Sequence, residues 1–384
     1  MTDHWAQPPP PPTKLGRYRK LAPLAGVHLS PISLGAMSIG DKWGSFMGSM
    51  DKEQSFKLLD AYYNAGGNFI DTANNYQDET SERFIGEWME KRGNRNQVFV
   101  ATKYTTNYKT GEGPEFGPKT FYTGNSIKAM HISVDESLKK LRTDYIDLLY
   151  VHWWDYETGI EEVMNGLHNL VTQGKVLYLG ISDTPAWVVS AANTYARLTG
   201  KTPFVIYQGA WSVMHRDFER EILPMARQQG MALAPWNVLA GGKIRTDEEE
   251  ERRRQTGEGG RTMGNPAWER NEDEKKVCKA LEKVAKEVGA KHITAVAIAY
   301  VMQKSPYVFP IVGGRKVEHL MSNLEALDID LSPEHIAYIE SVLPFQRGFP
   351  YDFFSSDDGD FNHLFKSAGH FDKWPAPQAI RPAK

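Results

Sequence analysis

Residues 146–181 read IDLLYVHWWDYETGIEEVMNGLHNLVTQGKVLYLGI, and this stretch contains the repeating unit that decides the fold. The apolar run at 146–152 predicts a strand buried on both faces. Apolar residues then recur at spacings of three and four, which predicts an amphipathic helix; they are Ile160, Val163, Met164, Leu167, Leu170 and Val171. Gly174 marks the end of this helix, and a second apolar run follows at 176–181.

The same alternation of strand and helix extends along the chain. Gly230 marks another helix end, and Val317, Leu320, Met321, Leu324 and Leu327 form a further helical face. Alternating elements imply parallel strands joined by right-handed crossovers, and eight such units close a barrel more naturally than they fill an open sheet. We therefore predict an α/β fold, a single (β/α)8 TIM barrel. Its eight strands are expected at 32–34, 68–71, 98–103, 146–152, 176–181, 204–208, 231–236 and 308–312.

We expect one domain at 14–384, preceded by a proline-rich arm at 1–13. Two segments interrupt the alternation. The insertion at 246–275 is densely charged and too polar to pack in a core, so it is expected to be a solvated loop and helix on the rim, or a lid over a cofactor. The tail at 344–384 is aromatic and is expected to contribute substrate loops.

Composition excludes several classes of protein. The 384 residues carry a net charge of −3, which argues against a nucleic-acid-binding surface. Cys278 is the single cysteine, so no internal disulfide can form and a reducing compartment is expected. No signal-peptide core and no run of about eighteen apolar residues is present, so we expect a cytoplasmic protein without membrane contact. The oligomeric state is left open.

Four ionisable residues are expected to meet at the mouth of the barrel. Asp71, Lys103 and His152 close the second, third and fourth predicted strands, and Tyr76 follows in the second loop. A lysine that ends a buried run needs a counter-ion, and Asp71 on the neighbouring strand is the obvious candidate. The ammonium is expected to lower the pKa of the Tyr76 phenol. Tyr76 would then act as the acid in carbonyl reduction, with His152 positioning the carbonyl oxygen.

Sequence blocks around these four residues resemble the aldo-keto reductases. The blocks are GNFIDTA at 67–73 with Tyr76, Ser81, Glu82 and Gly86, ATK at 101–103, and YIDLLYVH at 145–152. The likeness covers about 14–343. Within the family the chain is similar to fungal aryl-alcohol dehydrogenases and norsolorinic-acid-reductase-like proteins, on the stretches WNVLAGGK (236–243) and PIVGGRKVEHL (310–320). The resemblance implies the catalytic tetrad Asp71, Tyr76, Lys103 and His152, and an NADP-dependent oxidoreductase acting on an aromatic carbonyl compound or alcohol.

The expected nicotinamide site does not use a Rossmann fingerprint, because no G-x-G-x-x-G opens a helix after the first strand. Barrels bind phosphate after their last two strands, where glycines and cations occur here. The cofactor residues expected on these grounds and from the resemblance are Ser182, Asp183 and Gln208 for the carboxamide; Trp236, Asn237, Leu239, Gly241 and Lys243 for the nicotinamide and pyrophosphate; and Gly313, Gly314, Arg315, Lys316, His319 and Asn323 for the adenosine phosphate. Asp183 departs from the family, in which asparagine is commoner; an aspartate cannot donate to the amide oxygen.

Aromatic residues on the loops at the same end predict a wide, flat substrate pocket. The candidates are Trp43, Phe46, Tyr104, Trp153 and Trp154, with 345–354 as a possible closing segment. Two alternatives stay open. One is a Schiff-base lyase that uses Lys103, and the other is a non-catalytic sensor or regulatory barrel that binds the cofactor. A metal-dependent hydrolase is disfavoured, because the sequence has no H-x-H or H-E-x-x-H motif.

Overall fold

The computed structural model describes residues 5–44, 49–257, 268–354 and 363–382. Eight parallel strands form one sheet in the order β10-β3-β4-β5-β6-β7-β8-β9. The sheet curves round so that β9 pairs with residues 307–309, which lead into β10: the Leu233 N–H donates to the Tyr307 carbonyl (2.9 Å) and the Phe309 N–H donates to the Leu233 carbonyl (2.8 Å), so the barrel is nearly closed. This confirms the predicted fold. The strands are β3 (Ser33–Gly35), β4 (Phe69–Asp71), β5 (Phe99–Tyr104), β6 (Ile146–Val151), β7 (Val176–Ser182), β8 (Ile206–Ala210), β9 (Ala232–Trp236) and β10 (Ile311–Gly313).

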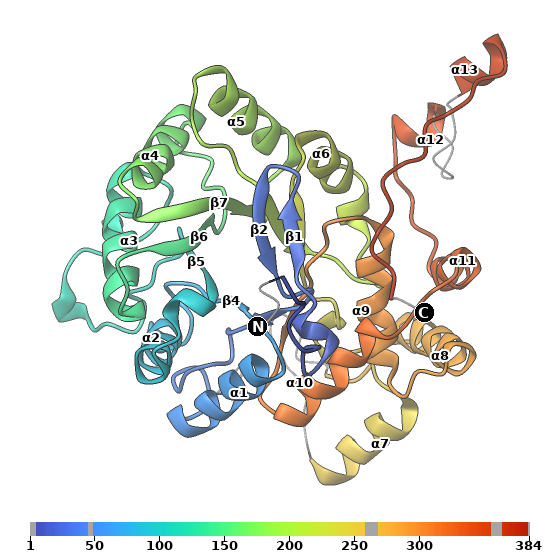
Figure 1. Ribbon diagram of the computed structural model, residues 1–384, viewed down its shortest axis with the longest axis horizontal. Helices are drawn as coiled ribbons and strands as arrows, with labels where there is room; N and C mark the ends of the chain where they lie inside the picture. Colours follow the sequence, from blue (N-terminus) through green and yellow to red (C-terminus); the bar gives the residue numbers. More distant parts are fainter. Residues whose placement is uncertain (1–4, 45–48, 258–267, 355–362, 383–384) are drawn as a thin grey trace.

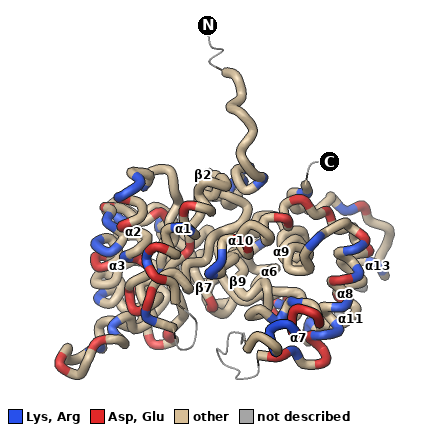
Figure 2. Tube along the Cα trace, turned by 90° about the horizontal axis from the view of Figure 1, so that it is seen from below, with Lys and Arg blue, Asp and Glu red and all other residues tan. Residues whose placement is uncertain are grey.

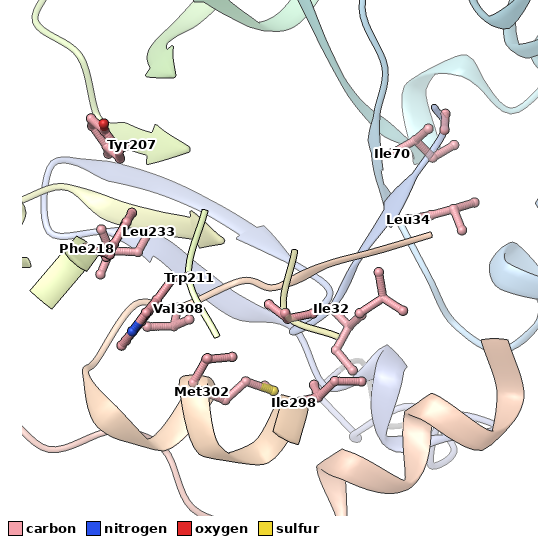
Figure 3. Close-up of a cluster of buried hydrophobic side chains, with 14 of the residues drawn as sticks. Ile32, Leu34, Ile70, Tyr207, Trp211, Phe218, Leu233, Ile298, Met302 and Val308 are labelled. Atoms are coloured by element: carbon pink, nitrogen blue, oxygen red, sulfur yellow. The ribbon is translucent and has the colours of Figure 1, made fainter. Parts of the chain in front are cut away.

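Helices surround the barrel and bury its outer face (Figure 1). The helices of the described chain are α1 (Lys52–Asn64), α2 (Thr80–Arg92), α3 (Ile127–Leu141), α4 (Ile160–Thr172), α5 (Ala186–Leu198), α6 (Ile222–Gln229), α7 (Asp247–Thr256), α8 (Glu272–Val288), α9 (Ile293–Lys304), α10 (Val317–Asn323) and α11 (Pro333–Val342), with the tail helices α12 (Tyr351–Phe354) and α13 (His363–Ala368) away from the barrel. Ile298 and Met302 of α9 belong to the same buried cluster as Leu34 and Leu233 of the strands (Figure 3). Gly174 and Gly230 follow their helices with positive φ, as predicted.

Helix α10 differs from its predicted pattern at one position. Leu320 is buried as expected, whereas Met321 is 40% exposed. The helix ends at Asn323 and the chain continues as a 3-10 turn over Leu324–Leu327. Leu324 and Leu327 of this turn are buried as predicted, so the departure is confined to Met321, at the edge of the apolar face of α10.

An N-terminal hairpin that the sequence did not predict closes the bottom of the barrel. Strands β1 (Arg19–Ala22) and β2 (Ala25–Leu29) pair antiparallel and lie across the barrel end in Figure 1. Leu21 and Leu29 join a second buried cluster that includes Phe69 and Phe99 of the barrel strands. The hairpin is short and only partly buried, so its apolar signal is weak. Before it, the proline-rich arm extends away from the body (Figure 2).

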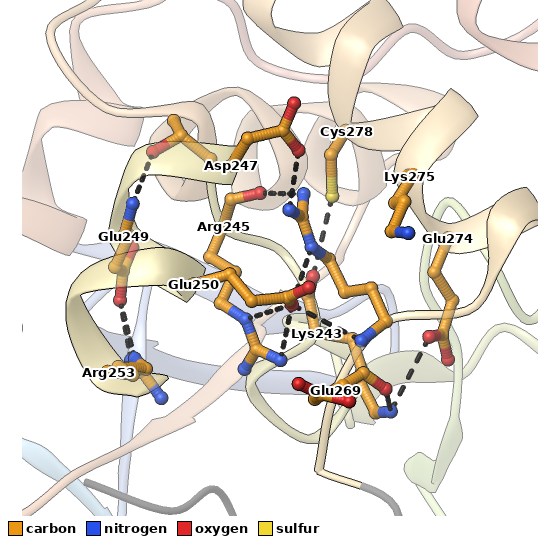
Figure 4. Close-up of polar contacts among 12 residues, drawn as sticks. Lys243, Arg245, Asp247, Glu249, Glu250, Arg253, Glu269, Glu274, Lys275 and Cys278 are labelled. Atoms are coloured by element: carbon orange, nitrogen blue, oxygen red, sulfur yellow. Dashed lines mark hydrogen bonds and ion pairs between the residues drawn. The ribbon is translucent and has the colours of Figure 1, made fainter. Parts of the chain in front are cut away.

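The charged insertion is packed more tightly than expected. Arg245, Glu250 and Arg270 are all at most 5% exposed. One carboxylate oxygen of Glu250 accepts from the Nε atoms of both arginines at 2.9 Å, and Arg270 also pairs with Asp247 at 2.6 Å (Figure 4). The expectation that this segment is too polar to pack is therefore wrong for its inner residues, because buried charges that neutralise one another are tolerated.

The surface charges are mixed in sign. Lys and Arg positions alternate with Asp and Glu positions over the outer helices (Figure 2). Within the described part of the chain, none of the helices has the length and apolar character needed to span a bilayer.

Candidate active site

The predicted tetrad converges on the end of the barrel where the strands finish. Asp71 ends β4, Lys103 lies next to the end of β5, and His152 directly follows β6. The Lys103 Nζ atom lies 2.6 Å from Asp71 Oδ1, and the two side chains are 0% and 3% exposed. Lys103 also donates to the Thr72 carbonyl at 2.7 Å. The expected counter-ion is thus present, and the ammonium is fixed from two directions.

Tyr76 is packed between the other members of the group. Its ring centroid lies 5.0 Å from Lys103 Nζ and 5.9 Å from the His152 ring, which it meets edge-on at 74°. The indole of Trp43 contacts Tyr76 from another side, with ring centroids 6.2 Å apart. The structure therefore brings together a phenol, an ammonium and an imidazole, which can act jointly on one bound oxygen atom.

Burial dominates the electrostatics of this group. It raises the pKa of Tyr76, and the opposing effect of the Lys103 charge is smaller. The expected net lowering of the Tyr76 pKa is therefore wrong, although Lys103 acts in the predicted direction. Burial, followed by the Lys103 charge, holds the pKa of His152 well below its ordinary value. Tyr76 is thus a neutral phenol and His152 a neutral imidazole near pH 7.

The same balance keeps Lys103 charged. Burial alone would lower the pKa of Lys103, but Asp71 and Tyr76 together outweigh it, and the pKa is raised. A lysine nucleophile must lose its proton to attack a carbonyl group. The geometry therefore disfavours the Schiff-base alternative, because both the pKa and the two hydrogen bonds keep Lys103 as an ammonium.

Gln208 and Thr106 support the tetrad in ways that the sequence analysis did not include. The Gln208 side-chain N–H donates to Asp71 Oδ2 at 2.9 Å, so both oxygens of this carboxylate are engaged. Gln208 had been expected at the nicotinamide carboxamide instead. The Thr106 hydroxyl lies 3.3 Å from His152 Nδ1. A polar residue within the buried strand β8 was the available signal for Gln208, whereas the loop position of Thr106 carried none.

The residues expected at the carboxamide cluster around Asp183, just after β7. Its carboxylate accepts from Ser182 Oγ at 3.0 Å and from Trp236 Nε1 at 3.1 Å. The residue remains exposed on one side, yet the burial of its carboxyl group among these neighbours raises the pKa to about 6. Asp183 also has a positive φ of 45°, which aspartate tolerates better than most residues. The structure thus joins β7 and β9 through one titratable group.

The residues expected at the phosphates lie in two loops. Asn237 and Gly241 follow β9 with positive φ, while Leu239 lies between them. After β10, Arg315 and Lys316 are exposed, as is His319 of α10, whereas Asn323 is buried. An added Cβ on Gly314 would meet nothing within 4 Å, so the backbone there is accessible to an anion. Exposed cations beside open backbone are a donor set that suits a phosphate.

Lys243 does not join these loops. Its ammonium donates to the Glu269 carbonyl and lies 3.5 Å from Glu274, so it points into the charged insertion (Figure 4). A backbone carbonyl and the Glu274 carboxylate in the insertion explain its direction. Its expected role in cofactor binding stays a prediction.

The aromatic candidates divide into two groups. Trp43 contacts Tyr76, and Trp153 is 51% exposed with its ring 5.3 Å from His152. Tyr104 and Trp154, by contrast, are buried in the main apolar cluster, and their expected place in a substrate pocket stays a prediction. Successive side chains of a strand point to opposite faces, so Tyr104 must face away from its neighbour Lys103. Phe46 lies outside the described residues.

The described part of the tail begins beside the segment that precedes α6. Phe345 packs against Arg216 and Arg220 in the segment before α6, at 5.2 and 5.1 Å from its ring centroid. Phe349 and Phe353 are mostly exposed. Helices α12 and α13 stand away from the barrel in Figure 1. Segment 345–354 is therefore anchored beside the barrel through Phe345, and its expected part in closing the substrate pocket stays a prediction.

Comparisons with known proteins identify the family of this chain. The sequence profile of the Aldo/keto reductase family matches residues 31–344. An aryl-alcohol dehydrogenase (NADP+) of Phanerodontia chrysosporium is 70% identical over 383 residues, which cover 99% of both chains. The aldo-keto reductase ausK of Emericella nidulans is 53% identical and covers 92% of this chain and 88% of its own. Norsolorinic acid reductase A of Aspergillus parasiticus is 51% identical, covering 90% and 86%.

Proposed function

Because the chain belongs to the aldo/keto reductase family, we propose that it is an NADP-dependent oxidoreductase that interconverts aromatic aldehydes or ketones and their alcohols. The name of the 70% identical relative supports both the cofactor and the aromatic substrate. The observation that carries the proposal is the buried Lys103–Asp71 ion pair beside Tyr76 and His152. Such a group provides proton donors for an oxygen that becomes negative.

Each member of the tetrad has a separate task. Tyr76 donates its proton to the carbonyl oxygen during reduction, and its raised pKa keeps that proton in place until the oxygen becomes basic. Lys103 stabilises the phenolate that remains, and Asp71 with Gln208 holds Lys103. His152 donates from Nε2 to the same oxygen, with Thr106 donating to Nδ1 to fix that tautomer. In alcohol oxidation the Tyr76 phenolate accepts the proton.

The cofactor would be held along β7, β9 and β10. NADPH, when bound, supplies the hydride for the carbonyl carbon. Trp236 offers an aromatic face to the nicotinamide, and Asp183 lies where the carboxamide would bind. Arg315 and Lys316 offer positive charge to the adenosine phosphate and His319 offers a hydrogen bond, which favours NADP over NAD.

The substrate would bind between Trp43 and Trp153. Both indoles lie against members of the tetrad, Trp43 against Tyr76 and Trp153 against His152. Aromatic rings stack or meet edge-on with other aromatic rings more favourably than with alkyl chains of similar size. A planar aryl carbonyl compound is therefore the preferred substrate class.

A substrate panel tests this function directly. Substituted benzaldehydes, benzyl alcohols and short aliphatic aldehydes are assayed with NADPH and NADH by absorbance at the nicotinamide band. We expect turnover of the aryl aldehydes, with kcat/KM at least about tenfold higher for NADPH than for NADH, because an extra charged contact is typically worth that much. Absence of turnover with every carbonyl compound and alcohol would favour the non-catalytic sensor.

Asp183→Asn is expected to change the pH dependence of NADPH binding. Below about pH 6 the wild-type carboxyl is protonated and can donate to the carboxamide oxygen, whereas above pH 6 it is ionised and can only accept. The wild-type Kd should therefore rise as the pH increases from 5 to 7.5. The asparagine amide can donate at every pH, so the ratio of variant Kd to wild-type Kd should fall over that range. Calorimetric titration measures both; a constant ratio would remove Asp183 from the carboxamide site.

A further inference from the structure

The turn that follows Tyr76 has an uncommon backbone. Gln77, Asp78 and Glu79 have φ values of 53°, 46° and 75°, so three successive non-glycine residues occupy the left-handed region. L-residues seldom adopt this conformation, and it persists only where the surroundings hold it in place. The turn must therefore be fixed by contacts outside itself.

Gln77 fixes the turn to the loop after β3. Its Oε1 atom accepts from the backbone N–H groups of Lys42 (3.0 Å) and Trp43 (2.8 Å). Its Nε2 atom donates to the Met37 carbonyl at 3.1 Å. Gly40 passes so close that an added Cβ would lie 2.5 Å from Gln77 Cβ. The two loops are thus joined as one unit beside Tyr76.

Glu79 fixes the other side of the turn. Its carboxylate lies 2.6 Å from Lys109 Nζ and 3.1 Å from Lys140 Nζ, and all three side chains are largely buried. Lys140 also donates to the Asn74 carbonyl at 3.2 Å. The turn is therefore held at both ends, and the position of Asp78 between them is fixed.

Asp78 connects this fixed turn to an aromatic side chain of the site. Its Oδ1 atom accepts from the indole N–H of Trp43 at 3.0 Å. The same indole meets the Tyr76 ring edge-on, with 6.2 Å between centroids and 69° between planes. The bond to Asp78 opposes rotation of the indole about its side-chain torsions. Trp43 is thereby held as a flat surface at a set distance from Tyr76.

We propose that Asp78 is a specificity-determining positioning residue that holds the Trp43 indole as one wall of the aryl subsite. This inference rests on the proposed function. A planar aryl substrate would contact the wall formed by Trp43, whereas a short aliphatic aldehyde would reach Tyr76 without touching it. Asp78 thus acts on the binding of aryl substrates through Trp43 and leaves proton donation by Tyr76 unchanged.

Three substitutions at one position separate the hydrogen bond from the backbone strain. Asp78→Asn keeps an acceptor oxygen and tolerates positive φ; Asp78→Gly relieves the backbone but removes the acceptor; Asp78→Ala removes the acceptor and keeps the strain. Each variant is assayed with a substituted benzaldehyde and a short aliphatic aldehyde, together with the Kd of NADPH and the Tm. Trp43→Phe, which loses the donor N–H, is the matched partner variant.

The ratio of kcat/KM for the aryl substrate to that for the aliphatic substrate is the readout. We expect Asp78→Asn to keep this ratio within about twofold of the wild-type ratio. Asp78→Gly and Asp78→Ala should lower the ratio about tenfold by raising KM for the aryl substrate, because each loses a hydrogen bond to a charged group. Combining Trp43→Phe with Asp78→Gly should add no further loss. Kd for NADPH should not move.

Two results would overturn the inference. If Asp78→Gly kept the wild-type ratio of aryl to aliphatic kcat/KM and only Asp78→Ala lowered it, the change in selectivity would come from the backbone strain and not from the hydrogen bond. Equal losses for both substrates, or none, would remove Asp78 from substrate selection. A wild-type protein without aryl turnover is a different result, because it refutes the proposed function itself before any variant is compared.

Discussion

Tyr76→Phe is expected to lower kcat for aryl aldehyde reduction by about 10³-fold and to leave the Kd of NADPH within about twofold of wild type. The substitution removes one hydroxyl oxygen and keeps the ring that packs against His152 and Trp43. The carbonyl oxygen then loses its proton donor, while the expected cofactor contacts along β7, β9 and β10 are untouched. Single-turnover rates and fluorescence titration with NADPH measure the two quantities separately.

Tyr195→Phe is the matched control for this experiment. Tyr195 lies on α5, and its hydroxyl donates to the Asn165 side chain of α4 at 3.2 Å. Both residues belong to the outer layer of helices and not to the strand ends that carry the tetrad. The control should keep full kcat. If Tyr76→Phe kept more than about a tenth of the wild-type kcat, Tyr76 would not be the acid, and His152 would be the next residue to test.

The barrel and the Asp71–Lys103 pair were predictable because both follow from periodic rules. Alternating strands and helices give a parallel sheet, and the ends of parallel strands meet on one face. Lys103 at the end of a buried strand then has few possible counter-ions. The same strand geometry, applied one residue further, would also have placed Tyr104 on the opposite face, where the structure has it in the core.

The burial of Glu250 and the net pKa shift of Tyr76 could not be predicted from the sequence. Both depend on distances between segments whose separation in the chain follows no helix or strand period. Glu250 is buried because Arg245 and Arg270, twenty-five residues apart in the chain, lie on either side of it. Composition alone gives only the polarity of this segment. The net pKa shift of Tyr76 is a similar case, because burial and the nearby carboxylates raise the pKa while Lys103 lowers it. The sequence supplies the sign of each effect and not their balance.

Lys103→Met is expected to lower kcat by about 10³-fold and to reduce the free energy of unfolding by about 3–5 kcal/mol. The loss of stability follows because Asp71 would keep a buried charge with Gln208 as its remaining side-chain donor. The loss of activity follows because the Tyr76 phenolate would lose its stabilising cation. The Tyr76 pKa should therefore rise further, and the basic limb of the pH profile for alcohol oxidation should move to higher pH. Urea unfolding and the pH dependence of kcat/KM measure these effects.

The double variant Lys103→Met/Asp71→Asn separates the two consequences. Asparagine removes the orphan charge and can still accept from Gln208, so stability should recover to within about 1–2 kcal/mol of wild type. Activity should stay low, because no cation is left beside Tyr76. If the double variant regained both stability and activity, Lys103 would serve only to neutralise Asp71. If it regained neither stability nor activity, the ion pair would hold the end of β5 in place by its geometry. We expect stability to recover while activity stays low. That result would assign Lys103 to the proton transfer, because the neutral pair of methionine and asparagine can replace the balance of charge but cannot stabilise the Tyr76 phenolate.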